Sequence, residues 1–424
     1  GMYVGSYDGF TQWAAAKRLP KALKTIVPWV ANNPGNGLPM ENNVFLFVNH
    51  AWPFYVTNDK TLDNETYFDP ERWSAPNPWF QRWLQHPSYD AYWQAMTPHG
   101  RELATLDIPV LTITGYFDDG QQSALDYMRR HLLQRPDGEH LLLIGPWDHK
   151  GAQAERKSSA YNGYAIDSVA MVDTPEITFQ WMDHVFRGAP KPAILRDRVN
   201  YQVMGANVWK HAPSIDAMSR ERKTLYLGAA RTGAHYTLAE RPDAPVSALT
   251  QVVDFSDRST SLGDTYPNPV IGKTLDASSG LVFESAPFGK ATEVSGLFSG
   301  ELHVTTDRRD LDYAVTLYER LPTGELFQLS YIIGRASHAE DMTTRRLLTP
   351  GRKAILRFDR TRMTSRQLQP GSRLVVAVSV NKNAYAQVNH GTGKDVRDES
   401  IADAGKPMRV QWHTSSRIHV PISD

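Results

Sequence analysis

The sequence predicts a parallel α/β domain that is interrupted by a helical insertion and followed by an all-β domain. In the first half, short uncharged runs rich in β-branched residues alternate with helical segments, a pattern typical of a parallel sheet covered on both faces. From about residue 221 onward, short alternating segments are separated by Gly, Pro, Asp and Asn turns, which favours an antiparallel sandwich or jelly roll. The length of 424 residues agrees with two or three domains.

Three strands of the parallel sheet are predicted, at residues 23–30, 108–114 and 140–144. Between the second and third strands, apolar residues recur at helical spacing over residues 121–133. A strand, a helix and a strand at this spacing form a right-handed crossover unit. We therefore predict that residues 1–33 and 104–212 build the α/β domain.

Residues 34–103 differ from their surroundings, because they are rich in Trp, Tyr, Pro and Asn. Amphipathic segments around 78–84 and 89–96 predict short helices. The segment is either a large surface excursion or a cap over a functional site, since connections of this length are commonly functional. We predict a helical cap here and a jelly roll over residues 213–424.

Composition excludes several classes of function. Lys plus Arg and Asp plus Glu both number 46, and a formal net charge of zero argues against a nucleic-acid or anionic-membrane partner. Cysteine is absent, which excludes disulfides, thiolate nucleophiles and thiolate-bound metals. No apolar run is long enough to span a bilayer. The sequence does not determine the cellular compartment, and it leaves both a monomer and a homo-oligomer as alternatives.

Ser6 is the candidate nucleophile. Gly5 precedes it, Gly9 follows shortly after, and a helical run is predicted from Phe10 to Lys17. A serine on a tight strand-to-helix turn needs small neighbours, and the helix N-terminus favours developing negative charge. The full Gly-x-Ser-x-Gly pattern is not met, because Val4 and Asp8 occupy the glycine positions.

Two further residues complete a predicted catalytic triad. Asp118 directly follows the second strand and His149 directly follows the third. Taken singly, Asp118 is as well explained as a helix N-cap and His149 as a loop histidine. Together with Ser6 they lie at strand ends in the chain order Ser, Asp, His, which is the order of an α/β-hydrolase triad.

Six segments resemble one family, the CocE/NonD or X-prolyl dipeptidyl-peptidase-like serine hydrolases, and together they span nearly the whole chain. These are Gly-Ser-Tyr-Asp-Gly-Phe-Thr-Gln-Trp at 5–13, His-Pro-Ser-Tyr-Asp-Ala-Tyr-Trp at 86–93, Gly-Tyr-Phe-Asp at 115–118, Gly-Pro-Trp-Asp-His at 145–149, Val-Met-Gly-Ala-Asn-Val-Trp at 203–209 and Asn-His-Gly-Thr-Gly at 389–393. The resemblance implies an α/β-hydrolase domain with a cap and a C-terminal jelly roll.

The resemblance also implies a role for each site residue. Ser6 would be the nucleophile, His149 the general base and then acid, and Asp118 the group that orients the imidazole. The backbone N–H of Tyr7 would supply one oxyanion donor. In the family the second donor is a tyrosine hydroxyl from a loop well upstream of the nucleophile, and no residue of this sequence can be assigned to it.

The family's hydrolase domain begins several strands before the nucleophile, whereas Ser6 is almost the first residue here. The sequence is therefore expected to be a fragment, a processed product or the product of a truncated gene. Since one oxyanion donor is worth on the order of 10²–10³ in rate, this chain alone is expected to be weakly active or inactive.

The substrate pocket is less well defined by the sequence. Family members that act on α-amino acid esters carry acidic residues shortly after the triad aspartate, and Asp119 is the one acidic residue of that kind here. We favour Asp119 as an N-cap of the helix at 121–133 over amine recognition. Trp147 and aromatic residues of the insertion either wall an acyl pocket or form the cap's own core; those of the insertion are Trp52, Phe54, Tyr55, Trp73, Trp79 and Trp83.

The predicted function is hydrolysis of a small-molecule ester or amide through a covalent acyl-enzyme. No metal or organic cofactor is expected, because the histidines lack metal-ligand spacing such as His-Glu-x-x-His. One alternative is the release of X-Pro dipeptides by the same triad. The other is an inactive hydrolase part joined to a jelly roll that binds carbohydrate or protein.

Overall fold

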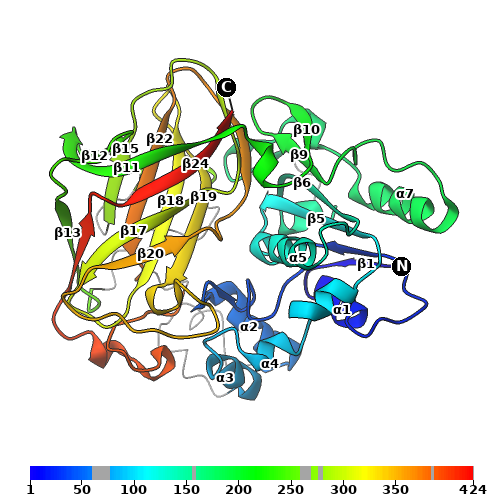
Figure 1. Ribbon diagram of the computed structural model, residues 1–424, viewed down its shortest axis with the longest axis horizontal. Coiled ribbons are helices and arrows are strands. Elements are labelled where there is room, and N and C mark those ends of the chain that lie inside the picture. Colours follow the sequence, from blue (N-terminus) through cyan, green and yellow to red (C-terminus); the bar gives the residue numbers. More distant parts are fainter. Residues whose placement is uncertain (60–76, 155–158, 258–268, 276–279, 383–385, 424) are drawn as a thin grey trace.

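The computed structural model describes residues 1–59, 77–154, 159–257, 269–275, 280–382 and 386–423. An α/β domain lies beside an all-β domain, and the insertion helices lie below both in Figure 1. Among the described residues, no helix is both long and apolar enough to cross a membrane.

The sheet of the α/β domain has the strand order β1-β2-β5-β6-β9-β10. Its first five strands are parallel, as predicted. The strands are β1 (Met2–Gly5), β2 (Ile26–Trp29), β5 (Val110–Phe117), β6 (His140–Asp148), β9 (Val199–Val203) and β10 (Val208–Ala212).

Helices cover both faces of this sheet because successive strand residues point to opposite faces. Ile26 packs on one face with Trp13 of α1 (Ser6–Ala16) and Tyr127 of α5 (Gln121–Gln134). Its neighbour Val27 packs on the other face with Trp181 of α7 (Thr174–Arg187). Both faces are therefore apolar, which explains why these strands read as uncharged runs.

The last strand corrects the expectation of a purely parallel sheet, since β10 pairs with β9 in the antiparallel sense. The turn between them contains two residues with left-handed backbone, Gly205 at φ 80° and Asn207 at φ 54°. A connection this short can only reverse the chain, because a parallel pair needs a crossover of a dozen residues or more.

The described part of the insertion is mainly helical, as predicted. It starts with a small hairpin, β3 (Met40–Glu41) and β4 (Val44–Phe45), whose turn contacts the all-β domain through Asn42 Nδ2, which donates to the Ile333 carbonyl at 2.9 Å. The helices that follow are α2 (Phe47–Val56), α3 (Pro78–Leu84), α4 (Ala91–Gln94) and the 3-10 helix η3 (Gly100–Thr105). Asn77 caps α3 by accepting from Trp79 N and Phe80 N.

The links between β6 and β9 hold α6 (His149–Ala152), β7 (Ala160–Tyr161), β8 (Tyr164–Ala165), η4 (Ser168–Ala170) and α7. Sequence signals fix the limits of α7. Asp173 accepts from Glu176 N at the N-terminus, and Gly188 ends the helix at φ 69°.

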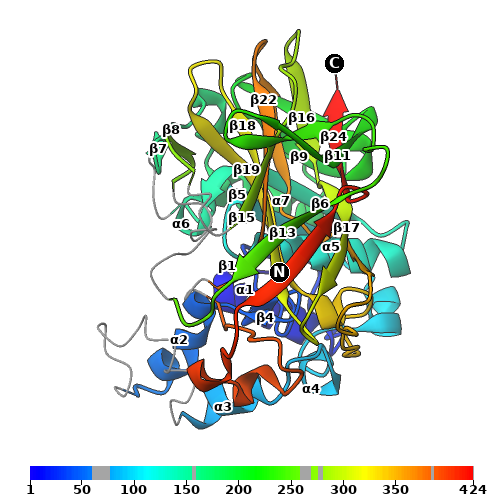
Figure 2. The same cartoon turned by 90° about the vertical axis from the view of Figure 1, so that its left-hand side faces the viewer.

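The all-β domain holds strands β11 to β24 in one 14-stranded hydrogen-bonded system, seen from a second side in Figure 2. Most neighbouring strands are antiparallel, and β12 pairs with β15 in parallel. Short 3-10 helices, η5 (Asp216–Met218), η6 (Ala336–His338), η7 (Val396–Asp398) and η8 (Ile401–Asp403), punctuate this half. The strands are β11 (Glu221–Thr232), β12 (His235–Ala239), β13 (Ala248–Val253), β14 (Ile271–Gly272), β15 (Gly280–Glu284), β16 (Thr292–Gly296), β17 (Ser299–Thr306), β18 (Asp312–Arg320), β19 (Leu326–Arg335), β20 (Ala354–Phe358), β21 (Thr364–Leu368), β22 (Arg373–Val380), β23 (Met408–His413) and β24 (Arg417–Ser423).

Close packing of α1 on β2 depends on Gly9. A Cβ atom at this position would lie 2.8 Å from Ala31 Cβ and 3.1 Å from the Trp29 carbonyl oxygen. We expect Gly9→Val to lower the free energy of unfolding by about 1–3 kcal/mol, because the helix must move off the sheet. Urea denaturation followed by circular dichroism measures this change.

Gly289→Val is the matched control, since no atom lies within 4 Å of the Cβ position of Gly289 and its backbone is not left-handed. Equal unfolding midpoints for the two variants would contradict this account of α1 packing.

Candidate active site

Ser6 lies at the turn between β1 and α1, because β1 ends at Gly5 and the helix begins at Ser6 itself. The helix thus starts four residues earlier than the sequence pattern predicted. The φ of Ser6 is 59°, in the left-handed region that residues with a Cβ atom rarely adopt. A strained strand-to-helix turn is the conformation of a nucleophile elbow. Among the described residues, Ser6 Oγ has no hydrogen-bond partner.

Glycines supply the small neighbours that this turn needs. At Gly5, an added Cβ would lie 1.9 Å from the side-chain oxygen of Gln153. The Gln153 amide in turn donates to the His149 carbonyl at 2.8 Å. Gln153 therefore packs between the serine turn and the segment that carries the histidine. Gly5 and Gly9 replace the glycines of the Gly-x-Ser-x-Gly pattern, with each displaced by one position.

An irregularity between β5 and β6 sets Asp118 opposite His149. Gly115 pairs with Gly145, but Phe117 pairs with Asp148, so β6 has one extra residue between the two pairs. The residues that follow are Asp118 on one strand and His149 on the other. Bulges of this kind occur next to active sites, where they redirect side chains.

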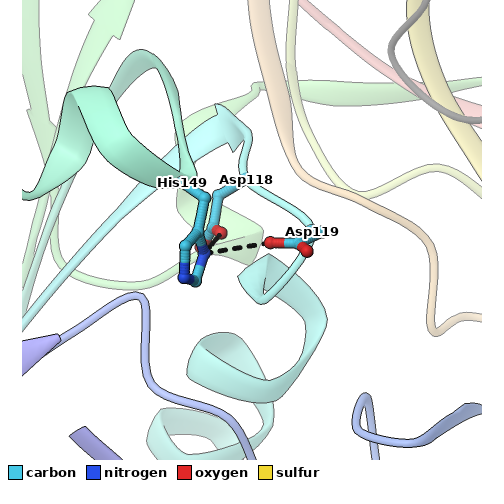
Figure 3. Close-up of side chains that lie close together, drawn as sticks. All are labelled: Asp118, Asp119 and His149. Atoms are coloured by element: carbon cyan, nitrogen blue, oxygen red, sulfur yellow. Dashed lines mark hydrogen bonds and ion pairs between the residues drawn. The ribbon is translucent and has the colours of Figure 1, made fainter. Parts of the chain in front are cut away.

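His149 binds two carboxylates through one nitrogen. Its Nδ1 lies 2.7 Å from Asp118 Oδ1 and 2.9 Å from Asp119 Oδ1 (Figure 3). The other ring nitrogen, Nε2, points away from both carboxylates (Figure 3). A histidine held at Nδ1 leaves Nε2 available for proton transfer.

The two aspartates differ in their surroundings. Asp118 is fully buried, whereas about half of the Asp119 side chain, 48%, is exposed. The Asp118 carboxylate accepts hydrogen bonds from Thr114 Oγ1 at 2.6 Å and from Gly120 N at 2.9 Å. These bonds satisfy the oxygens of a buried charge, and they fix the direction in which it faces.

The charges of the site favour a protonated histidine. Burial by itself would lower the pKa of His149, but the Asp119 and Asp118 carboxylates raise that pKa to about 11. Burial would raise the pKa of Asp119, but the neighbouring His149 holds it below its usual value. The arrangement stabilises the imidazolium, the form that a general base reaches after it accepts a proton.

The prediction that Asp119 caps α5 is wrong. The residue before the helix is Gly120, and no side chain caps this end. Asp119 instead faces His149. The sequence pattern could not separate the two roles, because an aspartate just before a helix has the same appearance in either case.

Gln121 and Gln122, which follow these aspartates, contact the all-β domain. The Gln121 side chain accepts from Met363 N at 2.7 Å and donates to the Met363 carbonyl at 3.1 Å. Gln122 donates to the Arg360 carbonyl. Nothing in the sequence pattern marked either glutamine as a contact between domains.

Tyr7, the predicted source of one oxyanion donor, lies in the first turn of α1. Backbone N–H groups of a first turn have no partner within their own helix. Asn32 N donates to the Ser6 carbonyl at 3.4 Å and holds the same turn against the loop after β2.

The predicted pocket aromatics lie in different surroundings. Phe54 is buried in the core of the insertion, with its ring centroid 5.5 Å from that of Phe80. Trp147 is buried in the α/β core, where its indole donates to the Ala170 carbonyl at 2.9 Å. These contacts favour packing roles for both. Trp52 lies against the exposed Tyr55 at 5.2 Å between centroids. Trp73 lies outside the described residues.

One group of described residues has ligand atoms within 4.8 Å of one another, close enough to hold a metal ion. The group consists of Asp118, Asp119 and His149. Two carboxylates and one imidazole are suitable ligands for several divalent ions. In this structure, however, the carboxylate oxygens already face His149 Nδ1. A bound ion would compete with the ion pair for these atoms.

Family comparisons cover both domains. Residues 1–151 match the family described as X-Pro dipeptidyl-peptidase (S15 family). Residues 195–416, more than half of the chain, match the X-Pro dipeptidyl-peptidase C-terminal non-catalytic domain. Cocaine esterase from Rhodococcus sp. (strain MB1 Bresler) is 25% identical over 448 residues, which cover 95% of this chain and 76% of the esterase.

Solved structures share the fold over almost the whole chain. An aminopeptidase from the marine sediment archaeon Thaumarchaeota archaeon matches with a TM-score of 0.82 at 19% identity, and an α-amino acid ester hydrolase with 0.80 at 20%. Both matches cover 100% of this chain and 76% of the other. A CocE/NonD family hydrolase from Staphylococcus aureus matches with a TM-score of 0.69 at 17% identity, over 99% of this chain and 71% of the other. The two matched domains, the esterase relative and this shared fold lead to one conclusion: the chain belongs to the CocE/NonD family of X-Pro dipeptidyl-peptidase-like serine hydrolases.

Proposed function

We propose that this hydrolase cleaves a small-molecule ester or amide with Ser6 as nucleophile, His149 as general base and Asp118 as the group that orients the histidine. One observation supports this assignment above the others. A serine with left-handed backbone lies at the same edge of the sheet as a histidine whose Nδ1 contacts a buried carboxylate. These are the parts that nucleophilic acyl transfer requires.

In the first half of the reaction, Ser6 Oγ attacks the substrate carbonyl carbon while His149 Nε2 takes the Oγ proton. The carbonyl oxygen becomes an oxyanion, for which the Tyr7 N–H is one donor. Collapse of this intermediate breaks the bond to the alcohol or amine. The leaving group receives the proton from His149, and an acyl ester on Ser6 remains.

Water then repeats the sequence on the acyl-enzyme. His149 takes a proton from water, the resulting hydroxide attacks the ester carbonyl, and the proton passes to Ser6 Oγ as the acid leaves. Asp118 stabilises the imidazolium at each stage and keeps the Nδ1 proton facing inward. Asp119 adds a second negative charge at the same nitrogen.

The contact between Asp119 and His149 also bears on the class of substrate. A peptidase that releases X-Pro dipeptides must hold a free ammonium group, normally with a carboxylate. In this chain the carboxylate next to the triad aspartate is already paired with His149. We therefore favour esters or amides without a free amine, in line with a relative that is named as an esterase.

Ser6→Ala is expected to abolish labelling by a fluorophosphonate, because the reagent forms its covalent bond with an activated serine. Intact-mass and peptide mapping should place a single adduct on Ser6 of the unmodified chain. Ser415→Ala is the matched control. Ser415 Oγ also contacts a histidine, at 2.6 Å from His303 Nδ1, but it lies in the all-β domain. An adduct on Ser415, or one that persists in Ser6→Ala, would contradict the assignment.

Ester hydrolysis is expected to rise with pH above neutrality. The base must be neutral to accept a proton, and the two carboxylates raise the pKa of His149 to about 11. Asp119→Asn removes one of these charges, so the pKa of His149 should fall by about one unit or more. The acid limb of the kcat/KM profile would then move to lower pH. An unchanged limb would show that Asp119 does not act on His149.

Phenyl esters of simple acids are expected to be hydrolysed faster than dipeptidyl-proline anilides. Initial rates with both substrates on one preparation provide the comparison. Turnover of the anilides alone would instead support the peptidase assignment. The rates should be insensitive to EDTA, since no proposed step uses a metal ion.

A further inference from the structure

We propose that Arg362, a residue of the all-β domain, is a positioning residue for catalysis. It fixes the turn that carries Asp118 and Asp119, so that both carboxylates meet His149. The domain that contains Arg362 matches a family model described as non-catalytic. The inference rests on the proposed triad and adds a function for the second domain.

Arg362 contacts the main chain of the aspartate turn directly. One guanidinium nitrogen, Nη1, donates to the Asp118 carbonyl oxygen. The other, Nη2, donates to the Asp119 carbonyl oxygen at 3.0 Å. Arginine presents its donors in a rigid planar fork, so two bonds to adjacent carbonyls fix the orientation of both peptide units. Those peptide units set the directions of the Cα–Cβ bonds from which the Asp118 and Asp119 carboxylates reach His149.

A buried carboxylate compensates the charge of Arg362. Glu41, from the insertion hairpin, forms an ion pair with Nη2, and both side chains are only 2% exposed. Tyr331 donates from its hydroxyl to Glu41 at 3.1 Å, and its ring lies 4.9 Å from the Arg362 guanidinium carbon. An unpaired charge in the protein interior costs free energy, so Arg362 and Glu41 stay together. The contacts with Glu41 and Tyr331 therefore hold the Arg362 guanidinium in one geometry.

Further bonds attach the neighbouring residues to the same turn. Gln121 pairs with the Met363 main chain, while Gln122 donates to the Arg360 carbonyl. Three residues of the segment 360–363, namely Arg360, Arg362 and Met363, thus contact the aspartate turn or the start of α5. Several bonds, and not one isolated contact, therefore join this segment of the all-β domain to the aspartate turn.

The charged groups that contact His149 are Asp118 and Asp119, and the buried pair of Arg362, from the all-β domain, and Glu41, from the insertion, lies on the other side of the aspartate turn. Arg362 and Glu41 carry opposite charges, and neither is among the groups that shift the pKa of His149. The net effect of the pair on His149 is consequently geometric: it decides how closely the two aspartates approach Nδ1.

Arg362→Lys tests the proposal, because lysine keeps the charge but lacks the planar fork. We expect kcat for a phenyl ester to fall by about 10- to 100-fold, the range that misplacement of a catalytic group produces. KM should change little, since Arg362 is buried and its guanidinium is already bound to main-chain carbonyls. The pKa of His149, measured by NMR titration of histidine-labelled protein and assigned with His149→Gln, should fall as the carboxylates loosen.

Arg335→Lys is the matched control. Arg335 forms an equally buried pair with Asp312 in the same domain, at 2.9 and 3.0 Å, and does not contact the aspartate turn. It should lose stability as Arg362→Lys does, while kcat and the pKa of His149 remain those of the unmodified enzyme. If Arg362→Lys does not fold, Arg362→Met/Glu41→Leu removes both charges together, and the same changes in kcat and pKa are expected.

A folded Arg362 variant with unchanged kcat and unchanged His149 pKa would overturn the proposal. The failure of the proposed function looks different, because the unmodified chain would then show neither ester hydrolysis nor labelling of Ser6. In that case the NMR titration still decides the positioning role, since it does not depend on turnover.

Discussion

The bond between a buried carboxylate and one nitrogen of His149 is the interaction on which the rest of the site depends. Removing a charge from water is expensive, and it is tolerated only where hydrogen bonds replace the lost solvent. Thr114 and Gly120 N supply these bonds to Asp118. The same bonds fix the carboxylate in one direction. The bonds that make the burial of Asp118 tolerable are therefore also the bonds that orient it toward His149.

Asp119 changes the balance of this familiar arrangement. A triad with one carboxylate stabilises the imidazolium after proton transfer, whereas a second carboxylate at the same nitrogen also stabilises it beforehand. Such a site gains a well-held base and keeps very little of it in the neutral form at pH 7. Because about half of the Asp119 side chain is exposed, dissolved salt and the charge of a substrate can change its effect on the pKa of His149.

Local patterns were sufficient to predict much of the fold and to select the residues of the proposed triad. Uncharged runs identified β2, β5 and β6, and strand ends identified Ser6, Asp118 and His149. The patterns failed where the role of a residue depends on the direction of its side chain or on contacts with residues far away in the sequence. The role of Asp119 depends on which way one side chain turns. Arg362 lies 244 residues from Asp118 along the chain, and no period or motif connects them.

The extra residue in β6 makes the site sensitive to chain length as well as to residue identity. Gly115 has no room for a Cβ atom, because the Trp147 carbonyl oxygen lies 2.0 Å from that position. If the ladder continued regularly from the Gly115–Gly145 pair, Asp118 would face Asp148 in place of His149, and two acids would then face each other. Over evolutionary time, single-residue insertions and deletions between Gly145 and His149 should therefore be accepted less often than most substitutions.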